Sequence, residues 1–178
     1  MIAGLSTSNF TILHVVVTLV AIVAGFVVMF ALLGSKRPAG WSAIFWIFTV
    51  ATTVTGFMFL QEPSFRTGIT PAIATGIIAT VFFVVGLYAL YVKKVIGSWR
   101  WIYVVTMMVS LYLNVFVLIT QSFQKLKFLN PAAPMVGPPF AEPTNTQFAI
   151  VQGLTILFFL VIGFLTVRKF RPVPTLSI

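Results

Sequence analysis

The chain has 178 residues, a mean hydropathy of +1.10 and only 7% charged residues, against roughly 25% in a soluble domain, which excludes a soluble globule and indicates a membrane protein. The formal net charge of +9 is typical of nucleic-acid-binding proteins, but the basic residues stand in short clusters between apolar runs, where they mark membrane topology. There is no cysteine, which excludes disulfides, Cys-ligated zinc and iron–sulfur clusters.

Five apolar runs follow one another along the chain, each with roughly the 20 residues that a helix needs to cross about 30 Å of hydrocarbon. They are continuous rather than alternating at every second residue, which argues against a transmembrane barrel. The runs cover residues 12–33, 41–59, 70–92, 102–123 and 147–167. We therefore predict an all-α fold in a single domain, residues 1–178, that forms a polytopic membrane bundle of five transmembrane helices.

The basic residues predict the orientation of these spans. Eight of the 11 lie on one side of the predicted membrane and three on the other, and lysine and arginine concentrate on the cytoplasmic side. The eight are Lys36, Arg37, Lys93, Lys94, Arg100, Arg168, Lys169 and Arg171, and the three are Arg66, Lys125 and Lys127. We therefore expect the N-terminus outside and the C-terminus in the cytoplasm.

The fourth span carries three side-chain amides within the stretch SLYLNVFVLITQSFQ, residues 110–124. Alternating steps of four and three residues place them on one face of a helix. This amide stripe comprises Tyr103, Met107, Ser110, Asn114, Val117, Gln121 and Gln124. Because an amide that faces hydrocarbon is costly, we expect the stripe to face the bundle interior. Three threonines on the second and first spans are the expected partners of the Asn114 amide: Thr52, Thr53 and Thr18.

Other polar residues are expected near the outer half of this stripe. The candidate site residues are His14, Glu62, Asn114 and Gln121. Two interpretations stay open for the amides: they join helices by hydrogen bonds, or they line a small polar cavity that opens to the outside. Glu62 is also placed to form an interfacial ion pair with Arg66.

His14 is the single histidine of the chain, and it is a candidate haem ligand. A haem with two axial ligands would need a second one, and Met58 lies at a similar depth. No catalytic constellation stands out, because the two acids, Glu62 and Glu142, lie on different loops and there is no glycine-rich phosphate loop. We expect no enzyme activity, no cofactor and no metal site.

Four segments, TTVTGFMF, GSWRWIYVVT, LYLNVFVLITQSF and PPFAEPTNTQFAIVQG, resemble those of a family of small bacterial multi-pass inner-membrane proteins. The resemblance covers nearly the whole chain. It implies a bacterial inner (plasma) membrane. Because no activity is established for that family, the resemblance implies no chemistry and no functional residues.

Three functions follow from these observations. The first is an accessory, assembly or scaffold component that packs against itself or a larger membrane complex, which the small-residue helix faces favour. The alternative is a transporter or channel for a small solute, which an outward-facing polar cavity would serve. A redox protein that holds haem or quinone comes third. The expected partners are the lipid bilayer and a homo-oligomer or larger membrane complex, and no nucleic acid.

Overall fold

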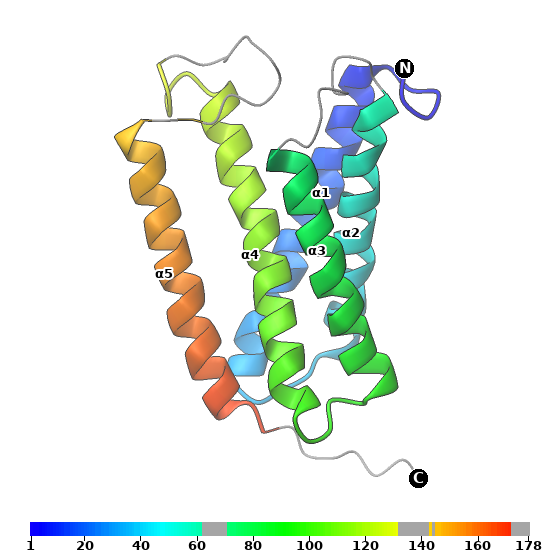
Figure 1. The fold of residues 1–178 in the computed structure, drawn as a ribbon, viewed down its shortest axis with the longest axis vertical. Helices are drawn as coiled ribbons and strands as arrows, with labels where there is room; N and C mark the ends of the chain where they lie inside the picture. Colours follow the sequence, from blue (N-terminus) through cyan, green and yellow to red (C-terminus); the bar gives the residue numbers. More distant parts are fainter. Residues whose placement is uncertain (62–70, 132–142, 144, 172–178) are drawn as a thin grey trace.

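The fold is all-helical over the part of the chain that the computed structural model describes, residues 1–61, 71–131, 143 and 145–171 (Figure 1). The main helices are α1 (Thr7–Leu33), α2 (Ala39–Met58), α3 (Pro71–Leu87), α4 (Trp99–Lys125) and α5 (Thr146–Lys169). A 3₁₀ turn, η1 (Phe59–Gln61), extends α2, and a π-helical turn, η3 (Tyr88–Val92), extends α3. Within the described residues, five helices are long and apolar enough to cross a membrane, so this is the architecture of a multi-pass membrane protein.

Four of the helices pack in a ring, and the fifth lies outside it (Figure 1). α1 packs on α2, α2 on α3, α3 on α4, and α4 on α1, which closes the ring. α5 packs mainly on α4 and makes a smaller contact with α1. The start of α1 lies at one end of the bundle, the N-terminal end, and the end of α5 lies at the other, the C-terminal end (Figure 1).

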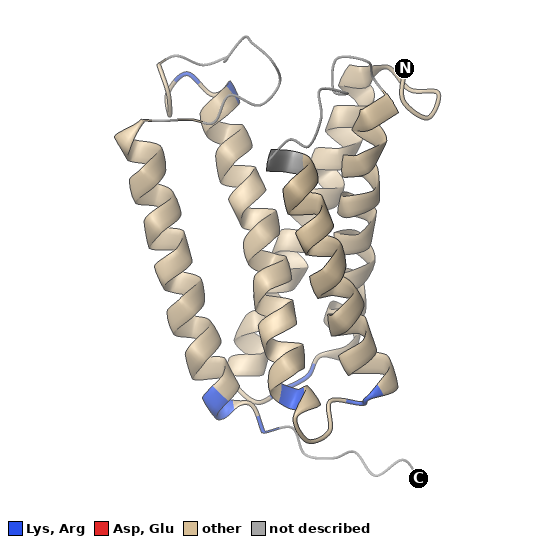
Figure 2. Ribbon diagram, in the orientation of Figure 1, with Lys and Arg blue, Asp and Glu red and all other residues tan. Residues whose placement is uncertain are grey.

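Basic side chains gather at the C-terminal end of the bundle (Figure 2). Of the lysines and arginines in the described residues, only Lys125 and Lys127 lie at the N-terminal end. Arg66, the third residue of that smaller group, is outside the described residues. Successive helices therefore run in opposite directions, which brings the larger group of basic residues to one end of the bundle.

α1 begins at Thr7 rather than at residue 12, where the first apolar run begins. Ser6 caps the helix, because its Oγ accepts a hydrogen bond from the backbone N–H of Asn9 at 3.2 Å. Asn145 caps α5 in the same way, through the backbone N–H of Phe148 at 3.1 Å. The apolar run marks the part of the helix that suits hydrocarbon, whereas the cap fixes where the helix begins.

Large apolar side chains fill the C-terminal half of the ring. The residues at most 1% exposed there include Phe45, Trp46, Tyr103, Met107 and Leu111. Gly86 of α3 permits this packing, because a Cβ at that position would lie 2.4 Å from Cη2 of Trp46. This half of the ring is therefore a closely packed apolar core.

Polar contacts fasten the C-terminal end of α5 to the ring. Nη1 of Arg100 donates hydrogen bonds to the carbonyls of Val167, at 3.1 Å, and of Phe170. The Ser35 hydroxyl donates to the Lys169 carbonyl at 2.7 Å. Because the last carbonyls of a helix have no partner within it, these contacts both cap α5 and hold it against α1 and α4.

Gln152 joins α5 to α4 nearer the N-terminal end. Its Nε2 donates to the Phe116 carbonyl at 3.2 Å and to Thr120 Oγ1 at 3.3 Å. Gln152 is buried, whereas most of the surface of α5 is exposed and apolar, as is expected of a helix that faces lipid.

Candidate functional site

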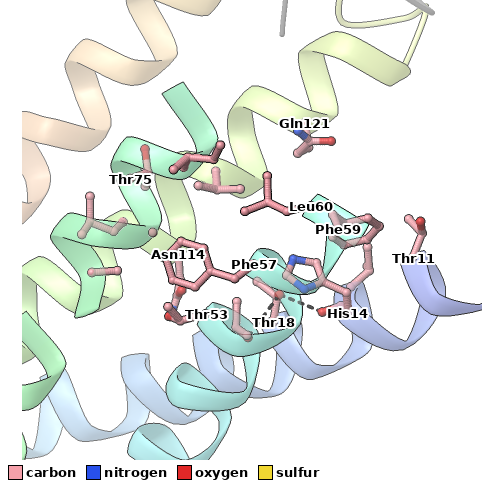
Figure 3. Close-up of a pocket in the computed structure, with 18 of the residues that line it drawn as sticks. Thr11, His14, Thr18, Thr53, Phe57, Phe59, Leu60, Thr75, Asn114 and Gln121 are labelled. Carbon is pink, nitrogen blue, oxygen red and sulfur yellow. Dashed lines mark hydrogen bonds between the residues drawn. The ribbon is translucent and has the colours of Figure 1, made fainter. Parts of the chain in front are cut away.

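A pocket lies inside the four-helix ring, in its N-terminal half (Figure 3). Its volume is about 270 Å³, close to the lower end of the roughly 300–1,000 Å³ that small-molecule sites occupy. We call it the ring pocket. All four ring helices line it: Thr11, His14, Val15 and Thr18 from α1; Thr52, Thr53, Gly56, Phe57, Phe59 and Leu60 from α2 and η1; Ile73, Thr75, Gly76 and Ala79 from α3; and Leu113, Asn114, Val117, Gln121 and Lys125 from α4.

His14 enters the ring pocket from the second turn of α1, because this helix begins at Thr7, five residues before the apolar run. Its Nδ1 lies 2.7 Å from Oγ1 of Thr55 on α2. The Thr55 hydroxyl has one proton, and the carbonyls of Ala51 (2.7 Å) and Thr52 (3.1 Å) on its own helix lie within hydrogen-bonding distance of it. When the hydroxyl donates to one of these carbonyls, Thr55 Oγ1 accepts from the Nδ1–H of His14; the tautomer of His14 decides between this arrangement and the reverse one. A neutral imidazole with its proton on Nδ1 has a bare Nε2, which is a hydrogen-bond acceptor.

Aromatic and small residues fix the imidazole in place. The ring of Phe59 meets the ring of His14 edge to face, with centroids 5.5 Å apart, and Phe59 packs in turn on Phe10. Gly56 lies under the imidazole, where an added Cβ would be 3.7 Å from Cε1 of His14. The imidazole thus has one nitrogen bonded to α2 and is held against η1, while its other edge borders the ring pocket (Figure 3).

The threonine hydroxyls of the ring pocket are mostly satisfied within the protein. Thr11, Thr18 and Thr53 each donate to a carbonyl of their own helix at 2.8–3.0 Å. Oγ1 of Thr18 also lies 3.3 Å from Oγ1 of Thr52, which forms a hydrogen bond between α1 and α2. Thr18 and Thr52 therefore join α1 to α2, while Thr11 and Thr53 bond within their own helices.

Asn114 lies at the deep end of the ring pocket. The side chain is 7% exposed, and its Nδ2 donates to Oγ1 of Thr49 on α2 at 3.3 Å. The amide stripe faces the interior and Asn114 bonds the second span, as predicted. The predicted partner residues, Thr52, Thr53 and Thr18, were wrong, because the amide bonds Thr49, which lies one turn deeper on α2 than Thr53.

Gln121 and Lys125 line the ring pocket at its N-terminal end. Gln121 is half-buried and Lys125 is exposed, and the two follow one another at a spacing of one helical turn on α4. Lys125 is the one charged side chain among the described residues of the lining. Glu62, the fourth predicted site residue, lies outside the described residues, as does its proposed partner Arg66.

Some residues of this site were not predicted from the sequence. Lys125 follows Gln121 by four residues on the same helix face, so the amide stripe already pointed to it. Thr55 and the two phenylalanines of the wall, Phe57 and Phe59, carry no such signal, because which face of α2 turns toward α1 depends on packing between the two helices.

The haem hypothesis paired His14 with Met58, and Met58 does not line the ring pocket. Within the described ranges, no group of three or more His, Cys, Asp or Glu side chains could hold a metal ion. The groups that the ring pocket offers to a guest are instead hydrogen-bonding ones: the Nε2 of His14, the amide of Gln121 and the ammonium group of Lys125.

No family model, no curated protein and no solved structure matches this chain. The fold and its hydropathy define the protein as a multi-pass helical membrane protein, and the comparisons identify no family within that class.

Proposed function

We propose that this protein binds a small amphipathic molecule in the ring pocket, inside the membrane and near the N-terminal end of the bundle. The observation that carries the proposal is the pocket itself: about 270 Å³ within the helical ring, with an apolar wall and a few hydrogen-bonding groups at defined places. That combination is typical of small-molecule sites, in which an apolar wall gives affinity and a few polar groups give orientation.

The floor of the pocket favours binding over passage through the bundle. Beneath Asn114 the ring is filled by Leu111 and Met107, both fully buried, and by Trp46, which is 1% exposed. A channel would need a polar path through this half, and a transporter would need a second conformation that opens it. We therefore prefer a binding protein to the transporter or channel that the polar cavity first suggested.

We also propose that the N-terminal end of the bundle faces the outside of a bacterial inner membrane. The clustering of basic residues at the C-terminal end supports this orientation, because lysine and arginine are retained on the cytoplasmic side. In that orientation the ring pocket belongs to the outer half of the bilayer. Its guest would enter from the periplasmic side or from the outer leaflet.

A scaffold or assembly role is the second candidate, and an apolar groove between α4 and α5 favours it. Met108, Tyr112, Phe159 and Gly163 are among its lining residues, and its volume is about 490 Å³. A helix from a second copy of this chain could pack there, with Gly163 permitting a close approach. Size-exclusion chromatography with light scattering would test this role: a dimer lost on Gly163→Leu supports it, and a monomer contradicts it.

Co-extraction tests the binding function directly. The membrane is solubilised with a lipid-retaining polymer, and small molecules that accompany the purified protein are identified by mass spectrometry. Gly56→Leu places a bulky side chain in the ring pocket. Gly153→Leu is the matched control, because Gly153 has open space around it on the surface of α5.

We expect wild type and Gly153→Leu to carry the same molecule in near-stoichiometric amount and Gly56→Leu to lose it. The proposal is contradicted if the three proteins carry the same compounds in the same amounts. A folded Gly56→Leu protein, with a helical circular-dichroism spectrum equal to that of the control, is needed for the comparison.

A further inference from the structure

We propose that the molecule bound in the ring pocket carries a hydroxyl group on an apolar ring, as a phenol or a hydroquinone does, and that this hydroxyl donates a hydrogen bond to Nε2 of His14. This inference rests on the proposed function and specifies its ligand class. It follows from the contact between His14 and Thr55, together with the shape of the wall around the His14 side chain.

The first step is the direction of the hydrogen bond between His14 and Thr55. Two carbonyls of its own helix lie 2.7 and 3.1 Å from Thr55 Oγ1, and we take the hydroxyl to donate to one of them. The imidazole then donates from Nδ1 to Thr55, and Nε2 is left as an acceptor. No partner for Nε2 is found among the described residues, while His14 lines the ring pocket. A guest that satisfies this nitrogen must therefore bring a donor, O–H or N–H.

The second step concerns the far side of the guest. Lys125 and Gln121 stand on α4 at the N-terminal end of the ring pocket, and both can donate to an oxygen. A hydroxyl on the ring, or a second oxygen on it, can accept from one of them. A ligand with only acceptors could bond Lys125 but would leave Nε2 of His14 without a donor, and an apolar ligand would bond neither group.

The third step is the shape of the body between these groups. Phe57, Phe59 and Leu60 from α2 and η1 line the pocket beside His14 (Figure 3). Opposite them, Gly76 on α3 leaves room for the Phe57 ring, because a Cβ there would lie 3.0 Å from Cζ of Phe57. Flat aromatic side chains pack well on a flat ring through edge-to-face and offset contacts. The wall therefore fits an aromatic body better than a branched or charged one.

The single histidine makes this inference testable by nitrogen NMR. Protein labelled with ¹⁵N-histidine gives one pair of ring signals, whose positions report which nitrogen carries the proton. We expect the Nδ1–H form in the free protein at neutral pH. Thr55→Val, which removes the acceptor without touching the pocket lining, should return the ring to a mixture of both forms. An Nε2–H form in wild type would overturn the inference.

The ligand class is tested with a pair of probes that differ only in the donor, 4-butylphenol and its methyl ether, 4-butylanisole. We expect the phenol to shift the Nε2 signal and to bind about tenfold more tightly than the ether, the loss of one hydrogen bond. In His14→Phe this preference should disappear. In Lys125→Met both probes should weaken alike, since an ether oxygen also accepts. Equal binding of phenol and ether to wild type would overturn the ligand class.

Two further measurements distinguish the ligand class from the more general proposal that the ring pocket binds a small molecule. A butyl-substituted hydroquinone and its oxidised quinone repeat the test of the donor, because only the reduced form can donate to His14, and tighter binding of the hydroquinone than of 4-butylphenol would indicate a guest with two hydroxyl groups. The amount of each probe retained by Gly56→Leu measures its partitioning into lipid, and this amount is subtracted from the amount retained by wild type. If neither probe binds but a co-extracted molecule is lost in Gly56→Leu, the ligand class is wrong and the binding function stands. If there is also no co-extracted molecule, both are wrong.

Discussion

Gly86 of α3 lies directly beneath the indole of Trp46 on α2, so close that a single added carbon would be 2.4 Å from Cη2. Trp46 cannot easily move away, because it is 1% exposed and packs against Phe45 and Tyr103 at centroid distances of 4.8 and 6.4 Å. We predict that Gly86→Ala costs about 1–3 kcal/mol, as overpacking of a core does. The measurement is thermal or denaturant unfolding in detergent.

Gly153→Ala is the control for this prediction, because nothing lies within 4 Å of the Cβ it would add. It should leave stability unchanged or raise it slightly, since alanine favours a helix over glycine. Equal effects of the two substitutions would show that α3 does not approach α2 as closely as described.

The hydrogen bond between Asn114 and Thr49 is predicted to contribute little to stability. Such bonds between membrane helices average about 0.6 kcal/mol. Asn114→Leu should therefore cost on the order of 1 kcal/mol or less, because the amide and its desolvation penalty are removed together. A double-mutant cycle with Thr49→Val measures the coupling. A coupling above about 2 kcal/mol would mean that Asn114 holds the bundle together rather than closing the pocket.

Gln152→Leu is predicted to change stability by less than about 1 kcal/mol. The substitution loses two bonds to α4, but it leaves no orphan there, because Thr120 still donates to the Phe116 carbonyl at 3.0 Å. It also removes the Gln152 Oε1, which is buried without a partner among the described residues. A loss of more than 2 kcal/mol in chemical unfolding would contradict this account.

The proposed orientation predicts which loops react with an impermeant thiol reagent in sealed cells. Phe128, 82% exposed, lies at the N-terminal end, and Ile96, 68% exposed, lies at the C-terminal end. Neither substitution by cysteine alters a charged residue, and the chain has no cysteine of its own. Phe128→Cys should be labelled in intact cells and Ile96→Cys only after lysis. The reverse pattern would place the ring pocket on the cytoplasmic side.

Hydropathy alone predicts the five membrane helices, because exposing charge or unbonded backbone to lipid is costly and each spanning segment must therefore be a continuous apolar run. Helical spacing predicts that the face of α4 with Asn114 turns inward, for the same reason. Other features depend on contacts between helices far apart in the chain. The Nδ1 bond of His14 to Thr55 spans 41 positions, and the fit of Gly86 under Trp46 requires both helices at once.

The start of α1 is an intermediate case. Ser6 is a recognisable cap residue, yet the apolar run suggested a later start, because hydropathy does not detect capping. For the pocket, the polar residues of α1 and α4 could be picked out from the sequence. Their grouping into a cavity with an apolar floor could not, because packing density is a property of the assembled ring.

The ring pocket should be open to small water-soluble molecules, and the rate at which Val117→Cys is modified measures this access. Val117 lines the pocket on α4 between Asn114 and Gln121. In purified protein with its native fold, we expect a small water-soluble thiol reagent to modify this cysteine. Gly56→Leu fills the pocket and should lower the modification rate at least about tenfold, which corresponds to about 1.4 kcal/mol of added activation free energy. Gly153→Leu should leave the rate unchanged. A cysteine that reacts only after denaturation, or at the same rate in both double variants, would contradict an accessible pocket within the ring.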